Sequence, residues 1–108
     1  MSRILLAFTI LTISAGGAAA LTPAQQRGFT FVETNCSMCH AVGHTGSSPL
    51  PVAPPFRTLH NFYPVDSLQE SLAEGIVTGH PSMPMFTLDP GQVDDVISYL
   101  KTLDQDQK

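Results

Sequence analysis

The chain has 108 residues, which is the length of a single domain, and it contains two cysteines and four histidines. Its formal net charge is −4, from five lysines and arginines against nine aspartates and glutamates. This balance argues against a nucleic acid as a partner, because phosphates require a basic surface.

Residues 1–20 have the pattern of a secretory signal peptide. Arg3 supplies a positive charge, residues 4–13 form an uncharged apolar stretch, and residues 18–20 are three alanines that suit a cleavage site. The apolar stretch is shorter than the roughly 20 residues of a membrane-spanning helix. We therefore expect residues 21–108 to form one domain exported to the periplasm, with no need for the membrane after cleavage. An uncleaved membrane anchor is the minority alternative.

The first predicted helix covers residues 21–36. Thr22 stands at the expected N-cap, Pro23 at the first helical position, and Gln25 at the position that completes a capping box. Gly28 lies inside this helix, where a glycine costs about 1 kcal/mol relative to alanine. We therefore expect a second helix to cross closely at this glycine.

Two irregular segments follow. Residues 41–64 contain five prolines, and so long a segment in a small domain indicates a functional loop or one wrapped around a ligand. A short helix is expected over residues 65–75, where apolar residues recur at a spacing of four and Gly75 suits the end of a helix. The second irregular segment, residues 77–87, joins this helix to the last one.

The last helix is predicted over residues 88–105. Asp89 is its expected N-cap, and Gln92 again completes a capping box. Five apolar residues fall on one face of this helix: Val93, Val96, Ile97, Leu100 and Leu103. Since no part of the chain alternates like a strand, the predicted fold class is all-α, with helices joined by long loops.

Cys36 and Cys39 are the only cysteines of the chain, and His40 follows them directly. A redox pair of this spacing normally opens a helix in an α/β fold, whereas this pair closes a predicted helix. A structural zinc ion needs four ligands, typically from two separated pairs. The remaining histidines have no partner at the required spacing: His44, His60 and His80.

A disulfide between the two cysteines suits an exported protein, but a gap of two residues would be strained in a continuing helix. Covalent haem attachment accounts for both cysteines and for His40. Two thiols at this spacing reach the two vinyl groups of one porphyrin, and the next imidazole faces the iron. Met83 and Met85 lie in the second irregular segment and are candidates for the opposite side of the iron, because a thioether is a soft ligand.

In order and spacing, these elements resemble the class I c-type cytochromes, which are small monohaem electron carriers of bacteria. The matching stretches cover nearly all of residues 21–108: CSMCH at 36–40 after a helix that carries Gly28, APPF at 53–56, MPMF at 83–86 and DDVISYL at 94–100. The resemblance implies three or more helices around one covalently bound haem c. Cys36 and Cys39 would form the thioether bonds, and His40 would bind the iron.

The resemblance also implies two further site residues. The axial methionine of the family directly precedes a proline, which favours Met83 over Met85, with His80 as a third candidate. The family's proline whose carbonyl oxygen accepts a hydrogen bond from the iron-binding imidazole corresponds to Pro54, with Pro55 as the alternative.

Outer-sphere transfer of one electron is the function that the resemblance implies, without catalysis on a substrate. The expected partners are an exported dehydrogenase, a membrane cytochrome complex or a terminal oxidase. Three alternatives remain open at this point. They are a cytochrome subunit fixed in a larger dehydrogenase, a haem enzyme or gas sensor with an open distal site, and an exported zinc or disulfide protein without haem.

Overall fold

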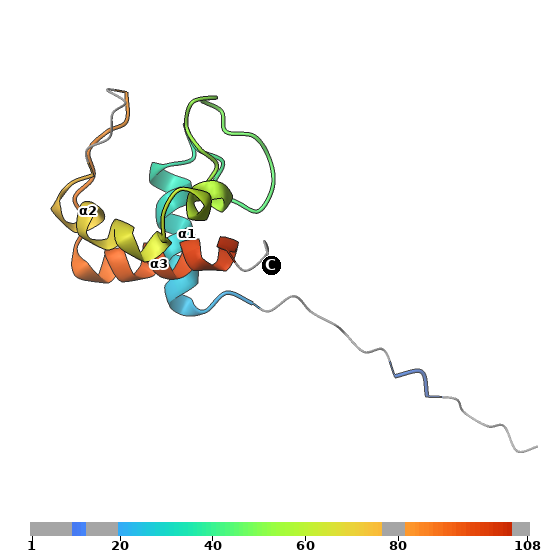
Figure 1. Ribbon diagram of the computed structural model, residues 1–108. Helices are drawn as coiled ribbons and strands as arrows, with labels where there is room; N and C mark the ends of the chain where they lie inside the picture. The colour runs from blue at the N-terminus through green and yellow to red at the C-terminus, as the bar shows by residue number, and fades with distance from the viewer. Residues whose placement is uncertain (1–9, 13–19, 77–81, 105–108) are drawn as a thin grey trace, which may run out of the picture.

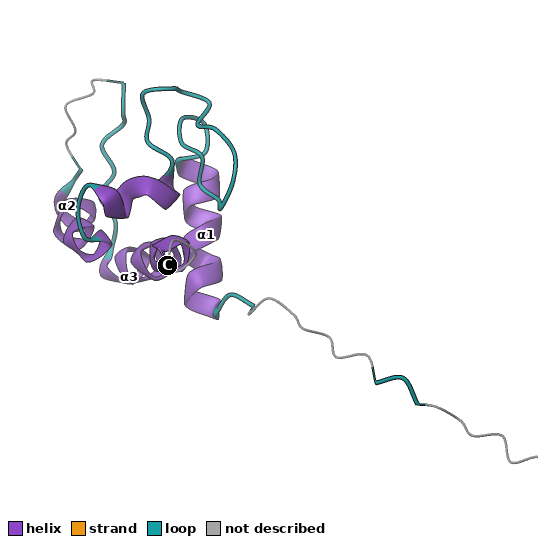
Figure 2. Cartoon of the chain, turned by 45° about the vertical axis from the view of Figure 1, so that its right-hand side comes forward, coloured by secondary structure: helices purple, strands orange, loops and turns teal. Residues whose placement is uncertain are grey.

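The computed structural model describes residues 10–12, 20–76 and 82–104. The predicted signal peptide therefore lies almost entirely outside the described residues, and so does His80. The described residues form helices and loops without any strand, which confirms the all-α fold class. Figure 2 shows these elements, which are in chain order α1 (Pro23–Asn35), η1 (Phe56–Asn61), η2 (Val65–Ser67), α2 (Leu68–Glu74) and α3 (Pro90–Asp104).

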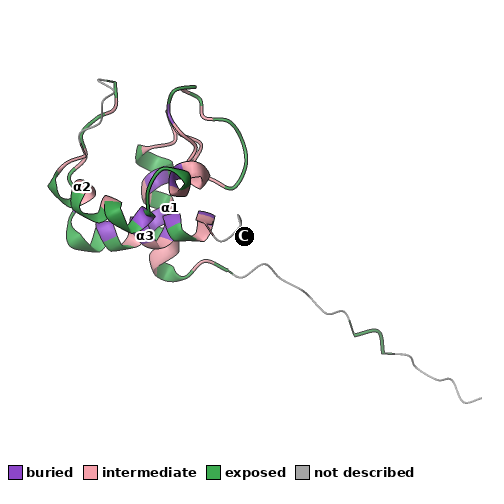
Figure 3. Cartoon of the chain, in the orientation of Figure 1, coloured by how far each residue is buried: buried purple, intermediate pink, exposed green. Residues whose placement is uncertain are grey.

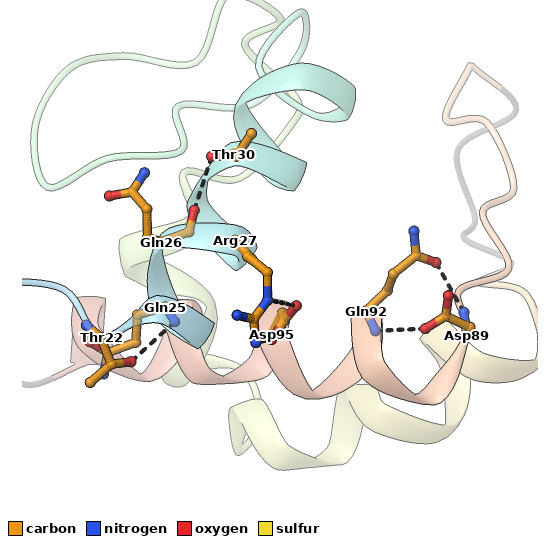
Figure 4. Close-up of polar contacts among 8 residues, drawn as sticks. All are labelled: Thr22, Gln25, Gln26, Arg27, Thr30, Asp89, Gln92 and Asp95. Atoms are coloured by element: carbon orange, nitrogen blue, oxygen red, sulfur yellow. Dashed lines mark hydrogen bonds and ion pairs between the residues drawn. The ribbon is translucent and has the colours of Figure 1, made fainter.

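Both long helices begin with the predicted capping boxes. The Thr22 hydroxyl accepts a hydrogen bond of 3.2 Å from the Gln25 N–H, and the Gln25 side chain accepts one of 2.9 Å from the Thr22 N–H. Asp89 and Gln92 repeat this pattern at the start of α3, with bonds of 2.8 and 3.1 Å (Figure 4). Each box satisfies backbone N–H groups that have no partner within the helix.

The helices α1 and α3 cross at Gly28, as the sequence predicts (Figure 1). A Cβ atom at this position would lie 2.0 Å from the carbonyl oxygen of Asp95 and 2.8 Å from Cβ of Tyr99. Only a glycine permits this approach, because no real Cβ atom tolerates such a distance. Phe29 packs against Tyr99 beside the crossing, with ring centroids 5.3 Å apart.

An ion pair on the outer side of the crossing joins the same two helices (Figure 4). Arg27 donates from Nε and Nη2 to the two carboxylate oxygens of Asp95, at 2.8 and 2.9 Å. The guanidinium group lowers the pKa of Asp95, chiefly through these hydrogen bonds. Such a bidentate pair has a defined geometry, so it aligns the two helices as well as attracting them.

The predicted apolar face of α3 forms the centre of the core. All five of its predicted residues are buried, and Tyr99 is buried with them. Val32 of α1 packs against this face and is 1% exposed. Figure 3 shows that buried positions concentrate in α3 and at its contacts, whereas the loops that rise from the helices are mostly exposed or half-buried.

Two details differ from the sequence-based expectation. The proline-rich segment 41–64 is not irregular throughout, because it contains the 3-10 helix η1, whose first turn follows Pro55. The helix expected over residues 65–75 consists of the short 3-10 turn η2 and then α2, and it ends at Gly75 with a φ of 112°. None of the helices in the described part of the chain is long and apolar enough to cross a membrane.

Candidate haem site

A cavity of about 480 Å³ lies beside the core. Its lining includes residues of the two loops that rise from the helices in Figure 1. Its volume falls within the roughly 300–1,000 Å³ of small-molecule sites. Its lining comes from the segment around the two cysteines and His40, from the proline-rich segment and from the loop before α3, and α2 and α3 contribute apolar side chains. Among the described residues that line it, none is an aspartate, glutamate, lysine or arginine. The cavity therefore suits a large apolar ligand.

Both cysteines and His40 line this cavity. The helix α1 ends at Asn35, and Cys36 follows as its C-cap. The N–H groups of Cys39 and His40 both donate to the Cys36 carbonyl oxygen, at 3.2 and 2.9 Å. This tight turn brings two thiols and an imidazole to the same cavity wall. The thiols are not joined by a disulfide, and burial raises the pKa of Cys36 to about 11.

The imidazole of His40 is held by the residue that the family resemblance indicates. Its Nδ1 lies 2.8 Å from the carbonyl oxygen of Pro54. Since a carbonyl oxygen can only accept, Nδ1 must carry the proton, and Nε2 keeps its lone pair free to bind a metal ion. Such a bond also restricts the orientation of the ring and raises the basicity of the metal-binding nitrogen. The carbonyl oxygen of the alternative, Pro55, accepts instead from the N–H and hydroxyl of Thr58.

Several further hydrogen bonds fix the loop that carries Pro54. The Phe56 N–H donates to the Ala41 carbonyl oxygen at 2.9 Å, and the Leu50 N–H donates to the Cys39 carbonyl oxygen at 3.1 Å. The Ala41 N–H donates to the Ser48 hydroxyl at 3.0 Å. The loop is thus bonded back onto the residues around His40.

The two candidate methionines differ in where they lie. Met83 is half-buried and lines the cavity. Met85 is 66% exposed, is not among the lining residues, and lies close to Gly75, where an added Cβ would be 3.1 Å from its sulfur atom. The loop that carries both is bonded to α2 and its end, through Ile76 N–H to Phe86 oxygen at 3.3 Å and Leu88 N–H to Leu72 oxygen at 2.8 Å.

The remaining histidines do not form a metal site in the described structure. His44 is exposed, and His60 lies on η1 with its Nδ1 3.5 Å from a carboxylate oxygen of Asp104. Among the described residues, no group of three or more histidines, cysteines, aspartates or glutamates is placed to hold a metal ion. The described geometry therefore offers no support for the zinc alternative.

A family model provides an independent comparison. The model of the family described as cytochrome c matches residues 25–104. The chain belongs to the cytochrome c family. This match confirms the resemblance and the cofactor prediction: the family carries covalently attached haem c, and Cys36 and Cys39 fit its attachment motif. No curated protein and no solved structure matched the chain. Membership of the cytochrome c family assigns the chain to haem-based electron transfer in general.

The cavity of this cytochrome c fits the group that its family carries. The described lining is mostly apolar and has no charged side chain, which suits a porphyrin ring, and it presents two thiols beside an imidazole with a free nitrogen. The contact of Phe56 with His40 is a site feature that sequence analysis missed, with ring centroids 4.8 Å apart. In the sequence, the only indication of this contact is that an aromatic residue, Phe56, stands two positions after Pro54. Phe62, by contrast, is 70% exposed and does not line the cavity.

Proposed function

We propose that this cytochrome c is a one-electron carrier whose haem iron is bound by His40 and Met83. Residues 1–20 would direct its export to the periplasm, and it would act there without catalysis on a substrate. Its partners would be other exported or membrane-bound redox proteins: a dehydrogenase, a membrane cytochrome complex or a terminal oxidase.

The observation that carries this proposal is the difference between the two methionines. The side chain of Met83 lines the same cavity as His40. Met85 is not among the lining residues and lies close to Gly75 at the end of α2. A haem bound in this cavity would therefore meet both the thioether of Met83 and the imidazole of His40. The pairing of thioether and imidazole favours the ferrous state and raises the reduction potential.

The chain's own residues support electron transfer rather than catalysis. Bound haem supplies a one-electron couple at its iron. The Pro54 carbonyl oxygen accepts a hydrogen bond from the His40 ring, and further hydrogen bonds hold the loops on both sides of the cavity, so a change of iron charge would require little rearrangement. The described lining is predominantly apolar, which disfavours water beside the bound group. Apart from the two cysteines and His40, Tyr63 is the only titratable residue among the described lining residues, so these residues offer little for acid–base catalysis.

A visible spectrum of the mature protein tests the proposal. The protein is produced in a host that attaches haem, and its ferric and ferrous spectra are recorded with and without carbon monoxide. We expect a low-spin ferrous spectrum that carbon monoxide does not change. Met83→Ala should open the iron to carbon monoxide, and the matched control Met85→Ala should not.

The other outcomes separate the alternatives. A wild-type spectrum that shifts with carbon monoxide would support an open distal site, and hence an enzyme or gas sensor. If carbon monoxide changes the spectrum of Met85→Ala but not that of Met83→Ala, Met85 rather than Met83 binds the iron. Mass spectrometry of the purified protein tests the export prediction, because cleavage after Ala20 leaves Leu21 as the first residue. Elution with a partner on a sizing column would favour a fixed subunit of a larger complex.

A further inference from the structure

The ring of Phe56 lies against the imidazole of His40. The two ring centroids are 4.8 Å apart, and the ring planes are inclined by 40°. This separation falls within the roughly 4.5–7 Å of favourable aromatic contacts. Both side chains line the cavity, so the contact is made at the ligand site itself.

The hydrogen bond of His40 does not by itself fix its ring. The backbone of His40 is held through its N–H, which donates to Cys36 at 2.9 Å, and Nδ1 is held by the Pro54 carbonyl oxygen at 2.8 Å. A ring anchored at these two points can still rock about the line that joins them, because hydrogen bonds to carbonyl oxygens tolerate a broad range of directions. A side chain packed against the ring removes this remaining freedom.

Phe56 is well placed to supply that packing. It is the first residue of η1, and its N–H donates to the Ala41 carbonyl oxygen at 2.9 Å. Its backbone is therefore bonded to the residue that directly follows His40. Pro54 and Phe56 belong to one short stretch of chain, which delivers the hydrogen-bond acceptor and the aromatic ring together.

We infer that Phe56 is a positioning residue, which sets the rotation of the His40 imidazole plane. This inference rests on the proposed function, in which His40 binds the iron. The plane of an axial imidazole distinguishes the two π orbitals of the iron that can hold the unpaired electron of the ferric state. Phe56 thus influences which part of the cofactor carries the transferred charge, although it does not bind the iron.

Proton NMR of the ferric holoprotein tests this inference. The order and spread of the paramagnetically shifted haem methyl resonances report the orientation of the axial ligand planes. Phe56→Leu removes the planar ring at similar volume, and Phe56→Tyr retains it. The matched control is Phe31→Leu, since Phe31 is another half-buried phenylalanine of the cavity lining and makes no ring contact with His40 in the described structure.

We expect Phe56→Leu to rearrange the methyl resonances and shift the reduction potential, while Phe56→Tyr and Phe31→Leu retain the wild-type order. The inference would be overturned if the haem methyl resonances had the same order and spread in Phe56→Leu and in Phe31→Leu. If Phe56→Leu fails to retain haem, proton NMR of the ferrous wild-type protein tests the inference instead. Contacts between protons of the Phe56 and His40 rings are expected, and their absence would also overturn the inference. A wild-type protein without the signals of an iron-bound histidine would instead refute the proposed function.

Discussion

The hydroxyl of Tyr99, on α3, donates a hydrogen bond of 2.5 Å to the carbonyl oxygen of Val42. Val42 stands two residues after His40, so the bond ties the core helix to the loop that leaves the haem site. The same tyrosine packs on Phe29 of α1 with its ring. One side chain therefore joins the helix crossing to the site, and burial raises its pKa, so that the hydroxyl remains a donor well above neutral pH.

Tyr99→Phe should weaken the protein without changing its haem ligands. The substitution keeps the ring contact and removes one hydrogen bond, and such a bond contributes about 1 kcal/mol to the free energy of unfolding. Urea unfolding of the holoprotein measures this loss, and the visible spectrum checks the ligands. An unchanged free energy of unfolding would mean that the Tyr99–Val42 bond does not persist in solution.

Gly28→Ala should strongly lower the free energy of unfolding, although it adds only one methyl group. The new Cβ would lie 2.0 Å from a backbone oxygen of Asp95, so the two helices must separate. Overpacking of this kind costs about 1–3 kcal/mol or more. The matched control is Gly43→Ala, because a Cβ at Gly43 meets nothing within 4 Å. Thermal or urea unfolding should show a large loss for the first variant only, and equal stabilities would contradict the observed crossing.

Local signals made most of the fold predictable. The capping boxes at Thr22 and Asp89 need only residues three positions apart, and the apolar face of α3 follows from helical periodicity alone. The 3-10 helix η1 was not predicted, because six residues among prolines show no periodicity that distinguishes them from a loop. It packs against α3, which is distant in sequence, so nothing local announces it.

The site was predictable to a similar extent and for the same reason. Cys36, Cys39 and His40 lie within five residues, so this part of the site can be recognised from a local motif together with the elements that surround it. For the two methionines the sequence offers one signal, the proline that follows Met83. The structure adds that Met83 lines the cavity, whereas Met85 does not and lies close to Gly75. The ring contact of Phe56 with the imidazole joins residues sixteen positions apart, and helical periodicity does not signal it.

The ion pair between Arg27 and Asp95 should contribute to stability at neutral pH and lose this effect in acid. The Arg27 guanidinium keeps the pKa of Asp95 below its ordinary value of 3.8. A carboxyl group whose pKa is lower in the folded than in the unfolded state stabilises the fold at pH values above its unfolded-state pKa. This contribution disappears as the pH falls through its folded-state pKa. The free energies of unfolding of wild type and Arg27→Met should therefore differ at pH 7 and converge below pH 3.8.

The size of this effect should be modest, because the Arg27 side chain is 63% exposed and the pair is open to screening by salt. Denaturant unfolding at the two pH values, each at low and high salt, measures it. Added salt should narrow the difference at pH 7. A difference between wild type and Arg27→Met that is independent of both pH and salt would show that Arg27 acts through packing alone.

The rim of the cavity should govern how two copies of the protein exchange an electron. Val52 lines the cavity and is 62% exposed, and the described lining carries no charged side chain. Two copies that approach at this rim therefore bring no charged side chain of the described lining into the contact. Val52→Glu would place like charges in this contact, and two unit charges 4 Å apart in water repel by about 1 kcal/mol, which slows exchange roughly fivefold.

Line broadening in mixtures of ferric and ferrous protein measures the self-exchange rate, and added salt should restore most of the loss in Val52→Glu, because salt screens exposed charges. The matched control is Phe62→Glu, which changes the net charge equally at a residue that is 70% exposed and lies outside the cavity lining. It should slow exchange much less. If the two variants slow exchange equally, net charge rather than the rim controls the encounter, and electrons leave the protein by another face.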